Sequence, residues 1–274
     1  VTTIHHPISK DLKFQLKSTK SIFLKFLMIR WHSFLRMQIK VAKKLNSVIV
    51  VSKSSKQDIH DDFGLKKEAM KVILNGIDTE AFFPDENIKK IPFRIVTSAS
   101  ADVPLKGLDY LLEAFSEVIK IFPDSTLQII GSSKQGGHTS RKINDLNIKE
   151  KVQFNNDLSF KEVRDLYCSA DVVVIPSLYE GFGFAIGEAM ACRVPVITTS
   201  GGAIPEVIED CGILVSPGNS KELEEAMIKL LPDEEKKSFF AEKGFNRIIE
   251  HLKWEKVAKL MTESYETEIN RITN

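Results

Sequence analysis

Two glutamates eight positions apart, Glu180 and Glu188, flank a glycine-rich segment of the sequence EGFGFAIGE. Gly181 and Gly183 stand one residue apart, between an apolar run typical of a strand and a pattern typical of a helix. Such a loop lets backbone N–H groups approach a ligand closely at the positive end of a helix dipole. Because the loop lets Glu180 turn back over the helix N-terminus, the two carboxylates could hold different hydroxyl groups of one polyhydroxylated ligand.

The same residues allow two other interpretations. In the first, Glu180 caps the helix and Glu188 lies on a solvated helix face. In the second, the glycines belong to a dinucleotide-binding fingerprint. The spacing Gly181-x-Gly183-x-x-x-Gly187 does not fit GxGxxG, and it follows a late strand of its domain instead of the first one.

Two further loops carry residues suited to binding phosphate. Lys106 and Gly107 follow the first strand of the same series, near the start of a helix, where a lysine can neutralise a phosphate held by the helix dipole. The alternative is an ordinary exposed lysine. Gly201 and Gly202 stand before a helical turn and form either a second phosphate cradle or a tight turn.

The elements that must position these residues alternate regularly. Several expected strands are continuous apolar runs, as in residues 172–175, which is typical of a parallel sheet covered on both faces. The pattern therefore predicts an α/β fold with a doubly wound parallel sheet, whose ligands bind at the carboxyl ends of its strands. Strands are expected at 94–98, 126–130, 151–154, 171–176, 195–199 and 212–215, and helices at 107–122, 139–146, 160–170, 185–192 and 220–231.

The rest of the chain suggests a second, smaller α/β region. A polar stretch with Pro84 separates the two regions, and a helical tail follows at 236–272. We predict a first domain at residues 1–78, a linker at 79–92, a second domain at 93–252 and a C-terminal helix at 253–274. In the first region we expect strands at 1–4, 47–52 and 71–74, one or two helices within 9–45, and a helix at 54–63.

Composition excludes several classes of protein. The 274 residues are 43% hydrophobic and 27% charged, with a net charge of +1, which argues against a disordered chain and against a globally basic nucleic-acid binder. Three cysteines without CxxC spacing argue against a disulfide scaffold and a zinc ribbon, and favour a cytoplasmic protein. No apolar stretch reaches the roughly 18 residues that span a bilayer, and no signal-peptide pattern occurs. The start at Val1 suggests an N-terminal truncation.

A basic segment, residues 10–44, interleaves Lys and Arg with large apolar residues. Lys13, Lys17 and Lys20 are spaced to share one helical face, and Arg36, Lys40 and Lys43 another. One interpretation is peripheral contact with an anionic membrane at its inner face. The other is a helix that packs on its own sheet with its lysines in water.

Taken together, these motifs resemble the retaining glycosyltransferases of family four. The resemblance rests on the E-x7-E motif in EGFGFAIGEAM, on Asn75–Asp78, on Pro104–Gly107 and on TTSGGAIPEVIED. It covers nearly the whole chain and is most specific from Leu74 to Val215. It implies the GT-B architecture of two Rossmann-like domains. Residues 93–252 would be the complete nucleotide-sugar-binding domain, 1–78 a partial acceptor-side domain, and 253–274 a helix that crosses back to it.

The resemblance also implies roles for single residues. Glu188 would hold the nucleotide ribose, Glu180 would contact the donor sugar, and Lys106 would stabilise the departing diphosphate. Backbone amides of Phe182, Gly183 and Phe184 would orient the sugar hydroxyls. The other expected donor-binding positions are loop glycines: Gly107, Gly131, Gly181, Gly201 and Gly202.

A histidine completes the implied catalytic set. His5 and His6 follow the first expected strand, and the resemblance places one histidine there close to the reacting sugar. Adjacent residues at a strand end face opposite ways, so the two are alternatives. His5 is the preferred candidate, and a structural or capping histidine pair is the other interpretation.

The implied reaction is sugar transfer from a nucleotide-diphosphate sugar, with retained configuration, to a lipid-linked, glycan or small-molecule acceptor. Cations and N–H groups would stabilise the leaving group without a metal or other cofactor. No D-x-D motif occurs, and His60-Asp61-Asp62 is more typical of a solvated helix face. The alternatives are a sugar-nucleotide epimerase of GT-B shape and a non-catalytic nucleotide-sugar-binding module. No nucleic-acid partner is expected.

The chain departs from the family pattern in two respects. Family members pair the lysine with an arginine about five residues upstream, where this chain has Ala101. Arg94 comes too early, inside the expected strand. The first domain is also only partial, so we expect the full-length parent to be an enzyme and this chain alone to be weakly active at best.

Overall fold

The computed structural model describes residues 1–5, 8–132, 134 and 136–273. The chain divides into two compact units, which we call unit 1 (Val1–Asn75 with Glu255–Asn274) and unit 2 (Gly76–Trp254). Residues 79–92, expected to form a linker, fall within unit 2. There Phe82 is buried, and the N–H of Ile91 donates to the carbonyl of Ser169.

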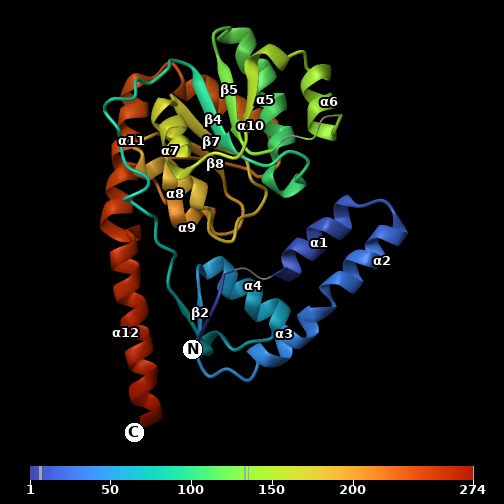
Figure 1. The fold of residues 1–274 in the computed structure, drawn as a ribbon, viewed down its shortest axis with the longest axis vertical. Helices are drawn as coiled ribbons and strands as arrows, with labels where there is room; N and C mark the ends of the chain where they lie inside the picture. Colours follow the sequence, from blue (N-terminus) through green and yellow to red (C-terminus); the bar gives the residue numbers. More distant parts are fainter. Residues whose placement is uncertain (6–7, 133, 135, 274) are drawn as a thin grey trace. The chain divides into compact units, whose positions relative to one another are not determined.

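The described part of unit 2 is built on a parallel sheet of six strands in the order β6-β5-β4-β7-β8-β9 (Figure 1). The chain winds outward from β4 to β6 and then returns to β7 beside β4, so the winding reverses between β4 and β7. This arrangement confirms the predicted doubly wound fold. The strands are β4 (Arg94–Ser98), β5 (Thr126–Ile130), β6 (Val152–Asn155), β7 (Val172–Ile175), β8 (Val196–Thr199) and β9 (Ile213–Val215).

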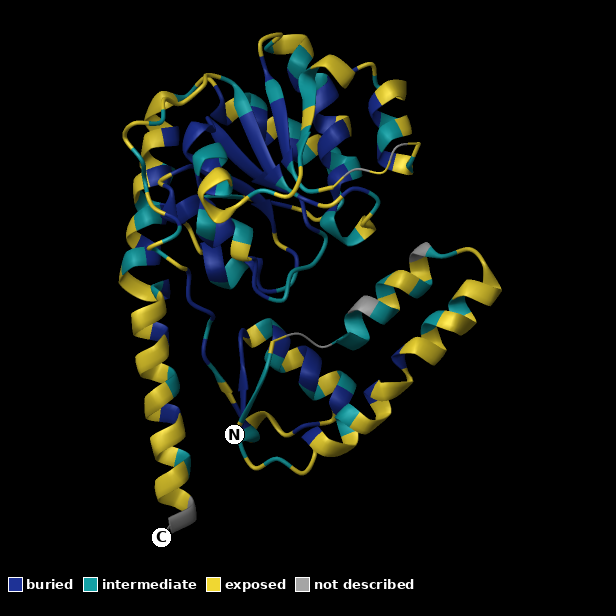
Figure 2. Ribbon diagram, in the orientation of Figure 1, coloured by how far each residue is buried: buried dark blue, intermediate teal, exposed yellow. Residues whose placement is uncertain are grey.

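Helices cover both faces of this sheet. Alternate strand residues such as Ile95 and Val174 join one core cluster with Leu111 of α5 and Met227 of α10. The opposite face is contacted by α7, α8 and α9. The inner strands β4, β5, β7 and β8 are largely buried and appear dark in Figure 2, whereas the edge strands β6 and β9 are partly exposed. The helices are α5 (Leu108–Ile121), α6 (His138–Asp145), α7 (Phe160–Ser169), α8 (Phe184–Ala191), α9 (Ile204–Ile208), α10 (Ser220–Leu230) and α11 (Glu234–Arg247).

The segments by which the chain enters and leaves unit 2 lie side by side. The N–H of Ile77 donates to the carbonyl of Leu252 at 2.7 Å. A Cβ atom on Gly76 would lie 2.7 Å from the Trp254 ring, so this close approach requires glycine. Beyond α11 a π-helix (Ile248–Leu252) ends at the extended residue Lys253, which interrupts the expected helical tail before α12 (Trp254–Thr273).

Unit 1 contains a parallel sheet of three strands within its described residues, β1 (Thr2–Ile4), β2 (Val48–Val50) and β3 (Met70–Val72) in chain order. Helix α4 (Lys53–Phe63) contributes Ile59 and Phe63 to its core. Val257 of α12 packs in a second cluster with Ile49 and Ile73.

The prediction of one or two helices within residues 9–45 is wrong. The described residues form three, namely α1 (Ile8–Ser18), α2 (Ile22–Trp31) and α3 (Leu35–Ala42). Ser21 caps α2 by accepting a hydrogen bond from the N–H of Leu24. Lys20 therefore lies beyond the end of α1, so the predicted face of Lys13, Lys17 and Lys20 is interrupted. Lys43 is the C-cap residue of α3 and keeps helical backbone angles, in line with Arg36 and Lys40.

Candidate functional site

The loops that follow β4 and β7 meet at the point where the winding of the sheet reverses. Lys106 Nζ lies 2.7 Å from Glu180 Oε1, and the Ser177 hydroxyl donates to the same oxygen at 2.7 Å. The N–H of Leu178 donates to the carbonyl of Leu105 at 2.8 Å. Such a reversal is where open α/β sheets bind ligands. The structure thus brings two of the predicted site residues together there.

Gly107 makes this junction possible. Its φ of 65° lies in the left-handed region, and a Cβ atom would stand 2.0 Å from the carbonyl oxygen of Pro176, at the end of β7. Because of both features, a residue with a side chain at position 107 would force the neighbouring backbone to move. Gly107 therefore fixes the distance between the Lys106 loop and the Glu180 loop.

The Gly201-Gly202 pair holds the Glu180 segment from the other side. Gly202 pairs with Glu180 in an isolated parallel bridge, and the N–H of Ala203 donates to the carbonyl of Glu180 at 2.9 Å. A Cβ atom on Gly202 would lie 2.3 Å from that carbonyl oxygen. Close backbone packing accounts for these glycines, and their role as a phosphate cradle stays a prediction. Gly131, directly after β5, is similarly confined, because a Cβ atom there would lie 2.5 Å from the carbonyl oxygen of Ala99.

The glycine loop ends at Gly183, which is the N-cap residue of α8 with φ 100°. The N-cap position is thus Gly183 instead of Glu180, whose carboxylate accepts from Lys106 and Ser177, so the interpretation of Glu180 as the cap is wrong. The first N–H groups of a helix lack partners within the helix and attract anions. Phe182 is buried and packs edge-on against Phe184, with ring centroids 5.0 Å apart, while Phe184 is 46% exposed.

Glu188 lies on α8, about one turn after its start, and its side chain is only partly accessible. The Tyr167 hydroxyl donates to Glu188 Oε2 at 3.4 Å. Burial raises the pKa of Glu188 to about 7, although the hydrogen bond from Tyr167 acts in the opposite direction. The alternative of a solvated helix face is therefore wrong, and the carboxylate carries a desolvation cost that a bound ligand could offset.

We expect Glu188→Gln to stabilise the ligand-free protein at pH 8. The folded-state pKa of Glu188 is raised from 4.5 to about 7, so its burial lowers stability as the pH rises through that window. Above pH 7 the cost is complete and reaches up to about 3 kcal/mol. In urea unfolding, the free energy of unfolding of the variant should exceed that of the wild type at pH 8. The two values should be nearly equal near pH 4.5. The exposed Glu150→Gln variant should show neither change, and an equal gain at both pH values would contradict the assignment.

The other predicted residues lie elsewhere. His5 follows β1 in unit 1 and is exposed, and its place near the reacting sugar stays a prediction; His6 lies outside the described residues. Ala101 is buried, and its N–H donates to the carbonyl of Ser132. Arg94 opens β4, at the opposite end of the strand from the Lys106 loop, where it donates to Ser169. Lys106 is thus the cation that the structure places beside Glu180.

No group of three or more His, Cys, Asp or Glu residues suited to a metal ion occurs in the described part of the chain. The candidate His60-Asp61-Asp62 is engaged in other contacts. Asp62 accepts from the Ser9 hydroxyl at 2.6 Å and pairs with Lys13, while His60 Nδ1 lies 2.7 Å from the carbonyl oxygen of Leu65.

Sequence reasoning missed two residues that hold the glutamates. Ser177 stands three positions before Glu180, and this spacing, typical of local capping, could have suggested their contact. Tyr167 gave no such signal, because it lies on α7, 21 positions before Glu188, and only the packing of α7 against α8 brings them together.

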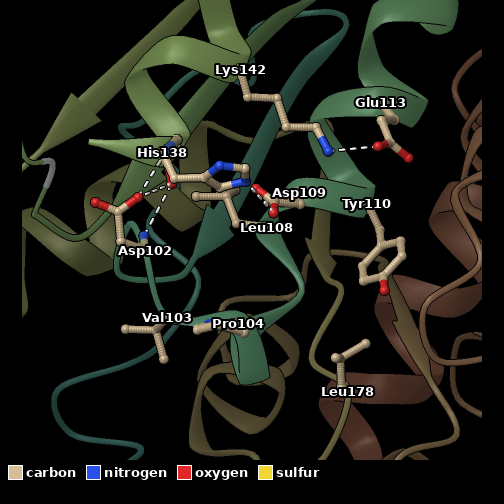
Figure 3. Close-up of a pocket in the computed structure, with 11 residues that line it drawn as sticks. Asp102, Val103, Pro104, Leu108, Asp109, Tyr110, Glu113, His138, Lys142 and Leu178 are labelled. Atoms are coloured by element: carbon tan, nitrogen blue, oxygen red, sulfur yellow. Dashed lines mark hydrogen bonds and ion pairs between the residues drawn. The ribbon is translucent and has the colours of Figure 1, made fainter. Parts of the chain in front are cut away.

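A separate pocket of about 380 Å³ lies between α5 and α6 (Figure 3). Its charged groups bond with one another: His138 with Asp109 at 2.8 Å, and Lys142 with Glu113 at 2.5 Å. Asp102 accepts hydrogen bonds from Thr139. Pro104 and Leu178, which flank the Lys106 and Glu180 loops, also line it. The pocket therefore borders the candidate site without containing its charged residues.

Models of two families match the chain. "Glycosyl transferases group 1" matches residues 78–247, and "Glycosyltransferase Family 4" matches residues 1–81. Within the described residues, no helix is both long and apolar enough to cross a membrane.

Individual proteins give a consistent result. An MMP alpha-(1->4)-mannosyltransferase of Mycolicibacterium hassiacum is 35% identical over 99% of this chain and 66% of its own length. A GDP-mannose-dependent monoacylated alpha-(1-6)-phosphatidylinositol monomannoside mannosyltransferase of Corynebacterium glutamicum is 27% identical over 84% of this chain and 64% of its own. The chain thus spans about two thirds of these relatives.

A solved structure agrees in fold. Anabaena Alr3699/HepE in complex with UDP-glucose superimposes with a TM-score of 0.77 at 22% identity, over 86% of this chain and 68% of that one.

Proposed function

Because this chain belongs to the group 1 glycosyl transferases, we propose that it transfers a hexosyl group from a nucleotide-diphosphate sugar to an acceptor, with retention of configuration and without a metal ion. The observation that carries the proposal is the contact between Lys106 and Glu180 at the reversal of the sheet. A cation and a carboxylate there suit the two ends of such a donor, its diphosphate and its sugar.

The proposed roles follow from the contacts of each group. Lys106 and the N-terminus of α8 bind the diphosphate and stabilise its charge as the sugar departs. Both hydrogen bonds that described residues donate to the Glu180 carboxylate fall on Oε1. Oε2 therefore accepts a hydroxyl of the donor sugar. Glu188 accepts the ribose hydroxyls, and the N–H groups at Phe182–Phe184 orient the sugar. His5 is the catalytic histidine that the family resemblance implies.

The proposed donor is GDP-mannose. Both curated relatives described above are mannosyltransferases, and the one from Corynebacterium glutamicum is GDP-mannose-dependent by name. The UDP-glucose complex of the Anabaena protein makes UDP-glucose the comparison donor. A mannose-containing glycan or glycolipid is the acceptor class that these names support.

A transfer assay tests the proposal. The protein is incubated with GDP-mannose or UDP-glucose and an α-mannoside acceptor, and the product is analysed by mass spectrometry and by the NMR coupling of its new anomeric carbon. A mannosylated product of α configuration is expected, without dependence on added metal or loss with chelator. Release of an altered free sugar without an acceptor would instead indicate the epimerase, and nucleotide binding without turnover the binding module.

A surface of unit 1 supports a further proposal, peripheral contact with an anionic membrane at the cytoplasmic face. Among its described residues, α2 buries none, and Ile22, Phe26 and Trp31 are all more than half exposed (Figure 2). The sequence carries no acidic residue from 12 to 57. Exposed apolar side chains on a segment of net positive charge suit an anionic lipid surface.

Vesicle sedimentation tests this contact. The protein should bind vesicles containing anionic phospholipid at low salt and dissociate at high salt. The double variant Arg36→Glu with Lys40→Glu should weaken binding at least about tenfold, since each basic residue contributes about 1 kcal/mol. Phe26→Ser with Trp31→Ser should also weaken it, whereas Lys149→Glu with Lys229→Glu in unit 2 should not. Absence of binding at low ionic strength would contradict the proposal.

A further inference from the structure

Two buried thiols on contacting helices, α7 and α8, line the same cavity. Cys168 is on α7 and Cys192 is the C-cap residue of α8, and both side chains line one cavity. The Cys168 thiol donates to the carbonyl of Phe83 at 3.5 Å. Both are almost fully buried, at 5% and 3% exposure. The third cysteine, Cys211, contacts Asp210 instead. The fold therefore pairs two residues that stand 24 positions apart in the sequence.

The pair borders a cavity that could admit a small oxidant. This cavity, of about 330 Å³, is lined by both cysteines and by charged residues that include Lys90, Asp171 and Lys237. Its volume is roughly ten times that of one water molecule in the liquid. A peroxide molecule fits within it, and polar lining groups can solvate it beside the sulfur atoms.

We propose that Cys168 and Cys192 form a reversible disulfide on exposure to hydrogen peroxide. The Cys168 thiolate attacks the peroxide O–O bond, gives a sulfenic acid and releases one water molecule after protonation. The Cys192 sulfur then attacks the sulfenic sulfur, the S–S bond forms, and a second water leaves. Two thiols and one peroxide thus give one disulfide and two waters.

The pKa values of the two thiols differ in the direction that this order of steps requires. The hydrogen bond from Cys192 lowers the pKa of the Cys168 thiol to about 7, and Arg164 acts in the same direction. Burial raises the pKa of Cys192 well above its usual value. The thiolate is the nucleophile toward peroxide, so Cys168 reacts first and Cys192 resolves the product.

The disulfide would act on the candidate site through Glu188. Tyr167, next to Cys168, bonds the Glu188 carboxylate, and the N–H of Cys192 donates to the Glu188 carbonyl at 3.0 Å. Bond formation draws the two sulfurs to about 2 Å and pulls the ends of α7 and α8 together. We therefore expect the oxidised protein to bind nucleotide several-fold more weakly, an effect that rests on the proposed function.

Peroxide treatment of the full chain tests the disulfide. Intact mass should fall by two hydrogen masses, and peptide mapping should join Cys168 to Cys192, with recovery under dithiothreitol. Cys211→Ser should behave as the wild type. Cys192→Ser should stop at a sulfenic acid that dimedone traps on Cys168, and Cys168→Ser should give no disulfide. Addition of oxygen atoms without loss of hydrogen in the wild type, or a bridge to Cys211, would overturn the proposal.

Nucleotide binding is measured separately, from the thermal shift that GDP and UDP cause in the reduced and in the oxidised protein. A several-fold weaker response after oxidation, restored by dithiothreitol, supports the coupling to Glu188. An unchanged response in protein that carries the disulfide overturns the coupling. If nucleotide stabilises neither form, the proposed function fails, and the mass measurement still decides the disulfide.

Discussion

Replacing Lys106 by alanine is expected to lower the rate of nucleoside diphosphate release from the donor roughly 100- to 1000-fold. That is the usual effect of removing one charge-stabilising group from a transition state. Lys106 stands beside Glu180, and Ala101 occupies the position where the family resemblance implies an arginine. The diphosphate charge would therefore depend on one lysine and the N-terminus of α8. Steady-state release of GDP from GDP-mannose with an α-mannoside acceptor measures the loss.

The controls separate charge from shape and from general damage. Lys106→Arg should retain more activity than Lys106→Ala, because it keeps a cation in the same loop. Lys149→Ala removes an exposed lysine of unit 2 and should leave the rate unchanged. A Lys106→Ala rate within about threefold of the wild type, measured in folded protein, would remove Lys106 from the proposed mechanism.

Gly107→Ala should cause the largest loss of stability. The left-handed conformation costs an alanine about 1–2 kcal/mol, and the contact with the Pro176 carbonyl, 2.0 Å from the new Cβ, adds about 1–3 kcal/mol. For a domain of this size the sum lowers the Tm by about 5–20 °C. Circular dichroism during heating provides the measurement.

Gly136→Ala is the matched control for this change. Gly136 has nearly the same φ, 69°, but a Cβ atom there meets nothing within 4 Å. It should therefore show only the conformational cost of about 1–2 kcal/mol. Equal losses in the two variants would mean that the junction between the β4 and β7 loops is not closely packed.

Regular local patterns made most of unit 2 predictable from sequence. The strands at 94–98 and 126–130 were predicted with the bounds that the structure shows, because both are short runs rich in β-branched residues. The doubly wound parallel sheet followed from the alternation of strands and helices. In unit 1 the predicted number of helices was wrong, because no Gly or Pro lies between α1 and α2, where the cap at Ser21 marks the boundary.

Site residues were predictable where each stands in a recognisable loop. They were not predictable where only tertiary packing brings them together. Lys106 and Glu180 each stood out by their own loops, and the sheet topology brings the loops together. The raised pKa of Glu188 depends on burial between α7 and α8, and the pairing of Cys168 with Cys192 depends on the same packing. Neither has a signal in local spacing.

The most direct test of nucleotide-sugar binding in unit 2 is thermal stabilisation of the chain by GDP, UDP and ADP, each with and without its sugar, in the wild type and in Glu188→Gln. A ligand at 100 times its Kd adds about 2.7 kcal/mol. We predict stabilisation by one nucleotide, with GDP the expected one, and its loss in Glu188→Gln, although that variant is more stable without ligand at pH 8. No stabilisation by any nucleotide, or an undiminished response in Glu188→Gln, would contradict the proposed site.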